Sequence, residues 1–328
     1  MNGLVSLHDI RQAAARIRAV ARVTPLLDLS VALPSSSAVR RLSVKCENLQ
    51  PAGAFKIRGA YNMAAQLSDA ERARGIVTYS SGNHGQSLAL AAHLLGIRAV
   101  IVMPTTAPAV KIEGARRYGA EVLFEGTTTL QRKARAEVEA GARGLTMVPP
   151  FDHPRIIAGQ GTIGLEILEQ CGEVGTVYVQ VGGGGLISGI AAAIKRMKPA
   201  VRIVGVEPSG APKMSASLRA GHPVTLERTS GVADGLLAVR PGDLTFPHVQ
   251  ALVDDVVTIE DDAILDAVRW LFREAKLVVE PSGAITVAAA FAGAGGPLDG
   301  PVVAVLSGGN VAPEAFAKYL VAEGGGRP

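Results

Sequence analysis

The sequence has few of the residues that mark a disulfide-rich, metal-binding or membrane-spanning protein. It holds only two cysteines, Cys46 and Cys171, which are far apart and form no CxxC pair. Neither a zinc site nor a disulfide framework is predicted, and a reducing compartment is the expected setting. No apolar run reaches the roughly 18 residues of a transmembrane helix, and residues 1–9 lack the pattern of a signal peptide. We therefore expect a cytoplasmic protein with no membrane partner.

Aromatic residues and runs of like charge are also scarce. Aromatics make up 4% of the chain, and the 33 Lys and Arg residues are scattered among 29 Asp and Glu residues. A net charge of +4 without a basic block does not indicate nucleic-acid binding. What the chain has in quantity is hydrophobic residues, at 48%, and 38 glycines among 328 residues. This composition is typical of an α/β enzyme with tight turns and alanine-rich helices.

Short apolar segments alternate with helical patterns along most of the chain. Strands are expected at 41–47, 76–79, 98–103, 121–124, 176–181, 202–206 and 302–306, and residues 146–148 lead into a domain crossing expected at Pro149-Pro150. Helices are expected at 6–20, 85–95, 110–118, 128–140, 161–170, 186–197, 261–275 and 282–292. This alternation predicts mostly parallel sheets that are covered by helices on both faces. Such sheets bind ligands at the carboxyl ends of their strands.

A run of four glycines, Gly182 to Gly185, lies between a predicted strand and a predicted helix. Backbone N–H groups free of side chains, together with the positive end of a helix, suit a phosphate. The dinucleotide pattern G-x-G-x-x-G fails, because Ile187 stands at its last position. Glu207 follows the next strand, where a ribose-binding acid would lie, so a dinucleotide stays open. A glycine-rich turn without a ligand is the remaining alternative.

Two further segments carry chemistry. Lys56 stands among apolar residues, which disfavours its ammonium form and leaves the neutral amine that Schiff-base chemistry needs. A surface lysine at the start of a helix is an equally good interpretation from spacing alone. Ser80–Gly85 follows a strand and opens a helix, which suits a carboxylate ligand, although an N-cap would look the same. Ser307–Asn310 also follows an apolar strand.

In their order, these segments resemble the fold-type II pyridoxal-phosphate family that holds threonine dehydratases and serine racemases. The matching segments are Ala54–Ala60, Ser80–Gln86, Ile157–Thr162, Val181–Leu186, Gly205–Pro208, Ala233–Gly235, Val279–Pro281 and Ser307–Asn310. The resemblance implies the cofactor pyridoxal 5'-phosphate and two three-layer α/β/α domains, as in the tryptophan synthase β-like fold. Residues 1–60 and 151–328 would form a large cofactor-binding domain, and 61–150 a small one. A homodimer is also implied.

The resemblance implies a role for each candidate site residue. Lys56 would form the Schiff base and later take the Cα proton, and Ser81 would be the acid/base on the opposite face of the cofactor. Phe55 would pack near the cofactor ring, Asn83 would hydrogen-bond the phenolic oxygen, and Ser307 would face the pyridine nitrogen. The phosphate would be held by the backbone of Gly182, Gly183, Gly184, Gly185 and Leu186. The substrate carboxylate would be held by Ser80, Ser81, Gly82, Asn83 and His84.

The chain departs from the family's pattern at its divalent-cation site. Glu207 and Ala211 match two ligands of that site, but Lys213 stands where an aspartate is usual. A positive side chain beside a dication is unfavourable, so no metal is expected. We hypothesise that the Lys213 ammonium takes the place of the metal charge. The chain also ends soon after Asn310, which leaves no room for the C-terminal regulatory domain of biosynthetic threonine dehydratases and favours a catabolic type.

The leading interpretation is an ammonia-lyase with a small hydroxyamino acid as its substrate. It would convert L-threonine or L-serine to 2-oxobutanoate or pyruvate plus ammonia. Serine racemase is one alternative, because Ser81 permits racemisation. A dehydratase of another hydroxyamino acid, such as hydroxyaspartate or phenylserine, is a second. A synthase that adds a nucleophile is disfavoured by the Ser80–Gly85 loop, and a non-catalytic binding protein is disfavoured by Lys56.

Overall fold

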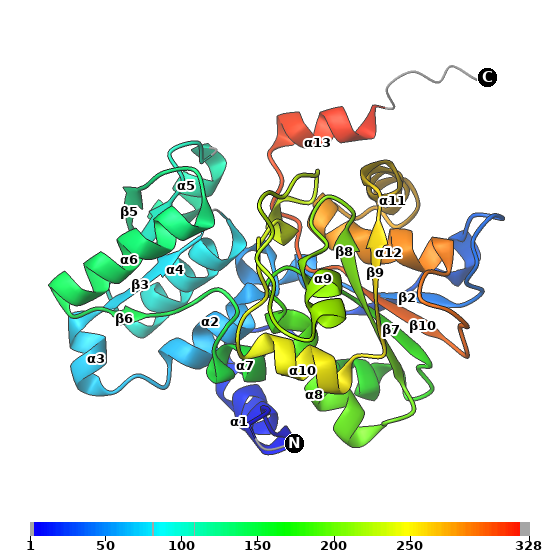
Figure 1. Cartoon of the computed structure of the whole chain (residues 1–328), viewed down its shortest axis with the longest axis horizontal. Coiled ribbons are helices and arrows are strands. Elements are labelled where there is room, and N and C mark those ends of the chain that lie inside the picture. Colours follow the sequence, from blue (N-terminus) through cyan, green and yellow to red (C-terminus); the bar gives the residue numbers. More distant parts are fainter. Residues whose placement is uncertain (1–2, 81, 108, 322–328) are drawn as a thin grey trace.

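The computed structural model describes residues 3–80, 82–107 and 109–321 and contains two sheets (Figure 1). One has six strands in the order β1-β2-β10-β7-β8-β9, and the other has four in the order β5-β4-β3-β6. All paired strands run parallel except β1 and β2. The strands are β1 (Leu26–Asp28), β2 (Leu42–Lys45), β3 (Ile76–Tyr79), β4 (Ala99–Met103), β5 (Glu121–Phe124), β6 (Thr146–Met147), β7 (Thr176–Gln180), β8 (Arg202–Pro208), β9 (Asp255–Ile259) and β10 (Val302–Val305). The predicted α/β fold with mostly parallel sheets is confirmed.

Helices cover the sheets. The α-helices are α1 (Leu7–Ile17), α2 (Lys56–Ala64), α3 (Asp69–Arg74), α4 (Asn83–Leu95), α5 (Ala109–Arg116), α6 (Thr129–Arg143), α7 (Pro154–Gln170), α8 (Gly185–Met197), α9 (Lys213–Ala220), α10 (Thr245–Leu252), α11 (Asp261–Glu274), α12 (Pro281–Ala292) and α13 (Pro313–Leu320). Short 3-10 helices lie at η1 (Ser30–Ala32), η2 (Glu47–Leu49), η3 (Pro51–Gly53) and η4 (Asp234–Leu236). No helix of the described ranges combines the length and the apolar character that a bilayer crossing requires.

The central strands are apolar on both faces because both faces are buried. In β7, Val177 and Val179 face a core shared with α1, α7, α8 and α10, while Tyr178 faces a second core shared with α11 and α12. In the four-stranded sheet, Ile76 and Ile101 face α2 and α4, and the opposite face packs on α6. Each sheet is therefore the middle layer of three.

The two sheets lie in two lobes of the molecule, with the four-stranded sheet on the left in Figure 1. The strands of the small lobe all come from residues 76–147, and those of the large lobe from the segments before and after. Helix α2 contacts both α4 of the small lobe and α7 of the large one. The domain boundaries at residues 60 and 150 stay a prediction, since α2 extends across the first of them.

Two helices begin two or more residues earlier than their sequence patterns indicate. Helix α7 starts at Pro154 with His153 as its N-cap, not at residue 161. Helix α4 starts at Asn83, within the segment taken as a ligand loop. The short helix α2, which begins at Lys56, carries no strong periodic signal because Gly59 lies in its middle. The structure therefore places more of the candidate site at helix N-termini than the sequence pattern indicates.

Candidate active site

One cavity of about 540 Å³ opens where loops at the carboxyl ends of β3, β7 and β10 meet α2 and η4. It brings together every described residue of the candidate site. These are Phe55, Lys56, Ser80, Gly82, Asn83, His84, Gly182, Gly183, Gly184, Gly185, Leu186 and Ser307. Ser81 lies outside the described residues, so its proposed place opposite Lys56 stays a prediction.

Lys56 is the first residue of α2, and its amine faces this cavity. The segment before it is fixed to the end of β10, because Phe55 N donates to Ser307 O at 3.0 Å. Lys56 Nζ donates to the carbonyl of Pro150 at 2.6 Å and lies 5.0 Å from the centre of the Phe55 ring. Burial lowers the pKa of Lys56 to about 8. Near neutral pH the side chain is therefore much closer to its reactive, uncharged form than an ordinary lysine.

The glycine loop forms an anion cradle at the N-terminus of α8. Helix α8 begins at Gly185, and the first N–H groups of a helix have no partner within it. Gly184 has a φ of 98°, which favours glycine. A side chain at Gly183 would lie 2.3 Å from the Phe151 ring, so the loop needs glycine there too. Thr245 Oγ1 donates to Gly183 O at 2.6 Å and fixes the loop from behind.

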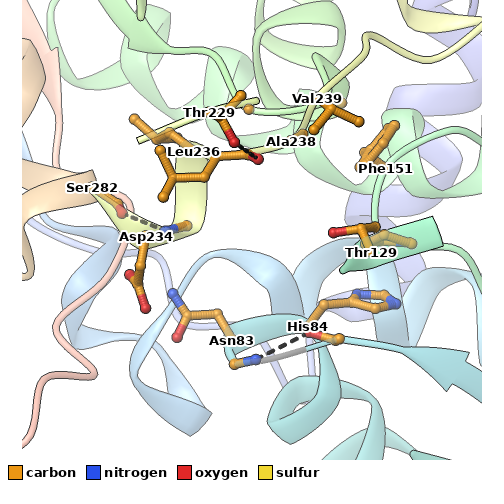
Figure 2. Close-up of a pocket in the computed structure, with 18 of the residues that line it drawn as sticks. Asn83, His84, Thr129, Phe151, Thr229, Asp234, Leu236, Ala238, Val239 and Ser282 are labelled. Atoms are coloured by element: carbon orange, nitrogen blue, oxygen red, sulfur yellow. Dashed lines mark hydrogen bonds between the residues drawn. The ribbon is translucent and has the colours of Figure 1, made fainter. Parts of the chain in front are cut away.

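Asn83 is held from both sides of its amide group. Its Oδ1 accepts a hydrogen bond from Asn310 at 2.9 Å, and its Nδ2 donates to Glu280 Oε1 at 2.6 Å. Because an amide nitrogen carries two hydrogens, the second is left for a ligand in the cavity. In Figure 2, Asn83 and His84 lie on one side of the cavity, opposite Leu236, Ala238 and Val239.

Glu280 is a functional candidate that the sequence did not reveal. It lies in the cavity wall, is only 4% exposed and contacts Asn83. Burial, reinforced by the charge of Asp234, raises its pKa to about 8. The sequence marked Val279-Glu280-Pro281 only as a matching segment, because an acid before proline at a helix start looks like an N-terminal cap. Its contact with Asn83 joins residues 197 positions apart, which no local pattern predicts.

His84 is fully enclosed and uncharged. Its Nε2 lies 3.1 Å from the carbonyl of Val148, which assigns the proton to that nitrogen. Burial and the nearby Lys56 lower the pKa of His84 to about 3. The ring therefore presents no positive charge and no N–H to the cavity. Any part that His84 has in binding a carboxylate must come from its backbone N–H in the first turn of α4.

Ser307 lies two residues after the end of β10, at the floor of the cavity, and is 3% exposed. Its nearest hydrogen-bond acceptor is the carbonyl of Ser282, at 3.5 Å. Gln180, which the sequence did not single out, also lines this floor and donates to the carbonyls of Ser282 and Val305. The floor therefore offers a weakly engaged hydroxyl to a ligand and contains no carboxylate at position 307.

Asp234 and Lys111 form an ion pair of 2.5 Å between the two lobes at the edge of the cavity. Lys111 belongs to α5 of the small lobe, and Asp234 to η4 of the large one. Figure 2 shows the Asp234 side chain next to Asn83. The cavity is therefore shared by both lobes.

The predicted divalent-cation position does not fit a metal. Glu207 and Ala211 lie together as expected, but the ammonium of Lys213 stands between them, 3.2 Å from Glu207 Oε1 and 3.1 Å from Ala211 O. Within residues 3–80, 82–107 and 109–321, no three His, Cys, Asp or Glu side chains gather as a metal site would require. A dication could enter only if this ammonium moved away.

Two mostly parallel α/β lobes, with a lysine amine and a phosphate cradle facing one shared cavity, define an enzyme that binds a phosphorylated carbonyl cofactor. The chain belongs to the pyridoxal-phosphate-dependent enzyme family, fold type II, whose model matches residues 17–308. Its cofactor is pyridoxal 5'-phosphate. The residues fit this group, since the cradle at α8 can take its phosphate and Lys56 its aldehyde.

Two functional kinds, serine racemases and threonine ammonia-lyases, are found among the relatives. A serine racemase of Oryza sativa subsp. indica is 45% identical over 87% of this chain and 83% of its own length. An L-threonine ammonia-lyase of Thermotoga maritima is 45% identical over 94% of this chain and 76% of its own. The structure of maize serine racemase, 40% identical, has a TM-score of 0.91 and covers 96% of both chains. The chain is thus placed in the threonine dehydratase and serine racemase group.

Proposed function

We propose that the protein is an ammonia-lyase that converts L-threonine or L-serine to 2-oxobutanoate or pyruvate plus ammonia. The observation that carries the proposal is the Lys56 amine, with a pKa lowered to about 8, in the same cavity as the N-termini of α4 and α8. One helix end suits the substrate carboxylate and the other the cofactor phosphate. The similarity to an L-threonine ammonia-lyase supports this choice of reaction.

In this proposal each side chain has a specific task. The neutral Lys56 amine takes the proton from the substrate Cα, and the bound cofactor supplies the electron sink for the charge that remains. The first turn of α4, with Ser80, Ser81 and Gly82 before it, holds the carboxylate. Asn83 orients the cofactor ring with its second N–H. Ser307 faces the ring nitrogen with a hydroxyl, which does not hold a proton there as a carboxylate would, and this favours prompt loss of the β-hydroxyl.

Serine racemase is the second candidate function. It is supported by the equal identity of the rice serine racemase and by the likeness to the maize enzyme. A racemase needs an acid on the face opposite Lys56, and Ser81 is the proposed group. We further propose that the protein is cytoplasmic, in keeping with Cys46 and Cys171, which are not paired with each other. We also propose that it forms a homodimer.

A substrate panel separates these functions. The purified holoenzyme would be given L-threonine, L-serine, a hydroxyaspartate and a phenylserine, and the release of 2-oxo acid and D-serine would be followed by chromatography. We expect 2-oxo acid from threonine or serine to form faster than D-serine, and no product from Lys56→Ala. If D-serine forms faster than pyruvate, the protein is a racemase. If only hydroxyaspartate or phenylserine reacts, the proposed substrate is wrong.

A further inference from the structure

A buried lysine outside the cavity occupies a cage of oxygen atoms behind the glycine loop. Lys213 is fully buried, and its Nζ donates to the carbonyls of Val181 at 2.7 Å, Leu236 at 2.9 Å and Ala211 at 3.1 Å. A fourth oxygen, Oε1 of the equally buried Glu207, lies 3.2 Å away. These distances are those of N–H···O hydrogen bonds and are longer than metal–oxygen bonds.

The oxygen atoms around Nζ match the donors of a charged Lys213. A neutral amine has two N–H groups and one lone pair, so it could satisfy two carbonyls and would turn its lone pair toward a third oxygen. The ammonium has three N–H groups, one for each carbonyl, and the carboxylate balances its charge. Glu207 is itself fixed, because the backbone N–H groups of Met214 and Ser215 donate to it at 2.8 and 2.9 Å.

The cage joins two walls of the cofactor cavity. Val181 immediately precedes the glycine loop, and Leu236 belongs to η4 on the wall that faces Asn83 in Figure 2. Gly235, next to Leu236, donates its N–H to Ser282 Oγ at 2.9 Å, which extends the connection to the start of α12. One buried charge therefore holds the phosphate cradle against η4.

We propose that the Lys213 ammonium is a built-in cation that positions the glycine loop, so that cofactor retention depends on this side chain and not on a bound divalent ion. One carboxylate and three carbonyls form an oxygen set that would otherwise suit a hard cation. Lys213 acts through the loop and is a positioning residue. The proposal does not depend on which amino acid is the substrate.

The test measures the dissociation constant of pyridoxal phosphate and the melting temperature of the cofactor-free protein, each in EDTA and in millimolar magnesium or calcium. For the wild type we expect the same values in all three conditions. Lys213→Met should raise the dissociation constant by at least about tenfold, whichever ion is present. Lys195→Met, which breaks a surface pair with Asp254, is the matched control and should bind the cofactor as the wild type does.

A second variant turns the cage into a metal site. Lys213→Asp places two carboxylates beside three carbonyls, so its melting temperature should rise with magnesium or calcium and fall again with EDTA. The proposal is overturned if the wild type loses cofactor in EDTA and regains it with magnesium. It is also overturned if Lys213→Met binds the cofactor as tightly as the wild type. If that variant does not fold, the wild-type and Lys213→Asp measurements decide.

Discussion

Glu280 shows how a single residue of the cavity makes stability depend on pH. Its pKa is raised from 4.5 to about 8, first by burial and then by the charge of Asp234. The folded protein therefore holds this proton more tightly than the unfolded chain does. By linkage, stability is highest below pH 4.5 and falls as pH rises from 4.5 to 8. Above pH 8 the group is charged in both states and the loss is complete.

Glu280→Gln should remove this pH dependence. Glutamine keeps the side-chain oxygen that accepts the hydrogen bond from Asn83, but it cannot ionise. Between pH 5 and 8 the wild type should lose stability relative to the variant by on the order of 1 kcal/mol per pH unit. Melting temperatures of the two cofactor-free proteins across this range measure the effect. If the difference between the two melting temperatures does not change between pH 5 and 8, the pKa of Glu280 is not raised in the folded protein.

At the scale of elements, α2 is fixed by a buried ion cluster on the side away from the cavity. Arg58, two residues after Lys56, lies 2.7 Å from Glu47 and 2.6 Å from Glu166, and its side chain is 1% exposed. Lys45 joins the cluster through Glu166 at 2.6 Å. The cluster ties the helix that carries Lys56 to the central sheet and to α7. The amine therefore has a fixed position before any ligand arrives.

Removing the guanidinium should destabilise the protein strongly. Arg58→Met leaves the fully buried Glu47 without its main partner, which costs about 3–5 kcal/mol. Arg135→Met, in which a partly exposed pair with Glu139 is lost, should cost less than about 1 kcal/mol. Urea unfolding of both variants gives the comparison. Equal losses would mean that the buried cluster does not hold α2 in place.

The errors at α2 and at the start of α7 share one physical cause, which is that glycine both breaks helices and lets helices pack closely. Gly59 and Gly159 interrupt helical patterns. The sequence pattern therefore does not predict α2, and it places the start of α7 too late in the chain. In the structure these glycines let two helices touch, because a Cβ on Gly159 would lie 2.6 Å from Gly59 Cα. From the sequence alone, a glycine that permits close packing cannot be distinguished from a helix breaker, because the helix that packs on it is not known.

Strand β9 was missed for another reason. Most of its residues are only half-buried, and so its sequence lacks a full apolar pattern.

At the scale of the whole molecule, the strands that were predicted are, apart from β5, those buried on both faces. Strand β3 has the expected bounds, and β7 and β10 differ by one residue, because a buried parallel strand is a continuous apolar run. Strand β5 also has the expected bounds, although it lies at the edge of its sheet and its residues are half-buried or exposed. The segments that follow β3, β7 and β10 were predicted as ligand loops on the same ground, and the structure brings all three to one cavity. The contact of Lys213 with Glu207 and Ala211 was expected from the sequence, because these residues are close together in the chain. Its contacts with Val181 and Leu236, and the contact of Glu280 with Asn83, were beyond prediction, because they join residues distant in sequence.

The same topology places Lys56, from the first fifth of the chain, beside a phosphate cradle from its middle. The direct test is to reduce the holoenzyme with borohydride, which fixes a Schiff base permanently on its lysine, and to locate the pyridoxyl group by peptide mass spectrometry. We predict that the group is found on Lys56. A label on another lysine, such as Lys111 at the edge of the same cavity, would contradict the account.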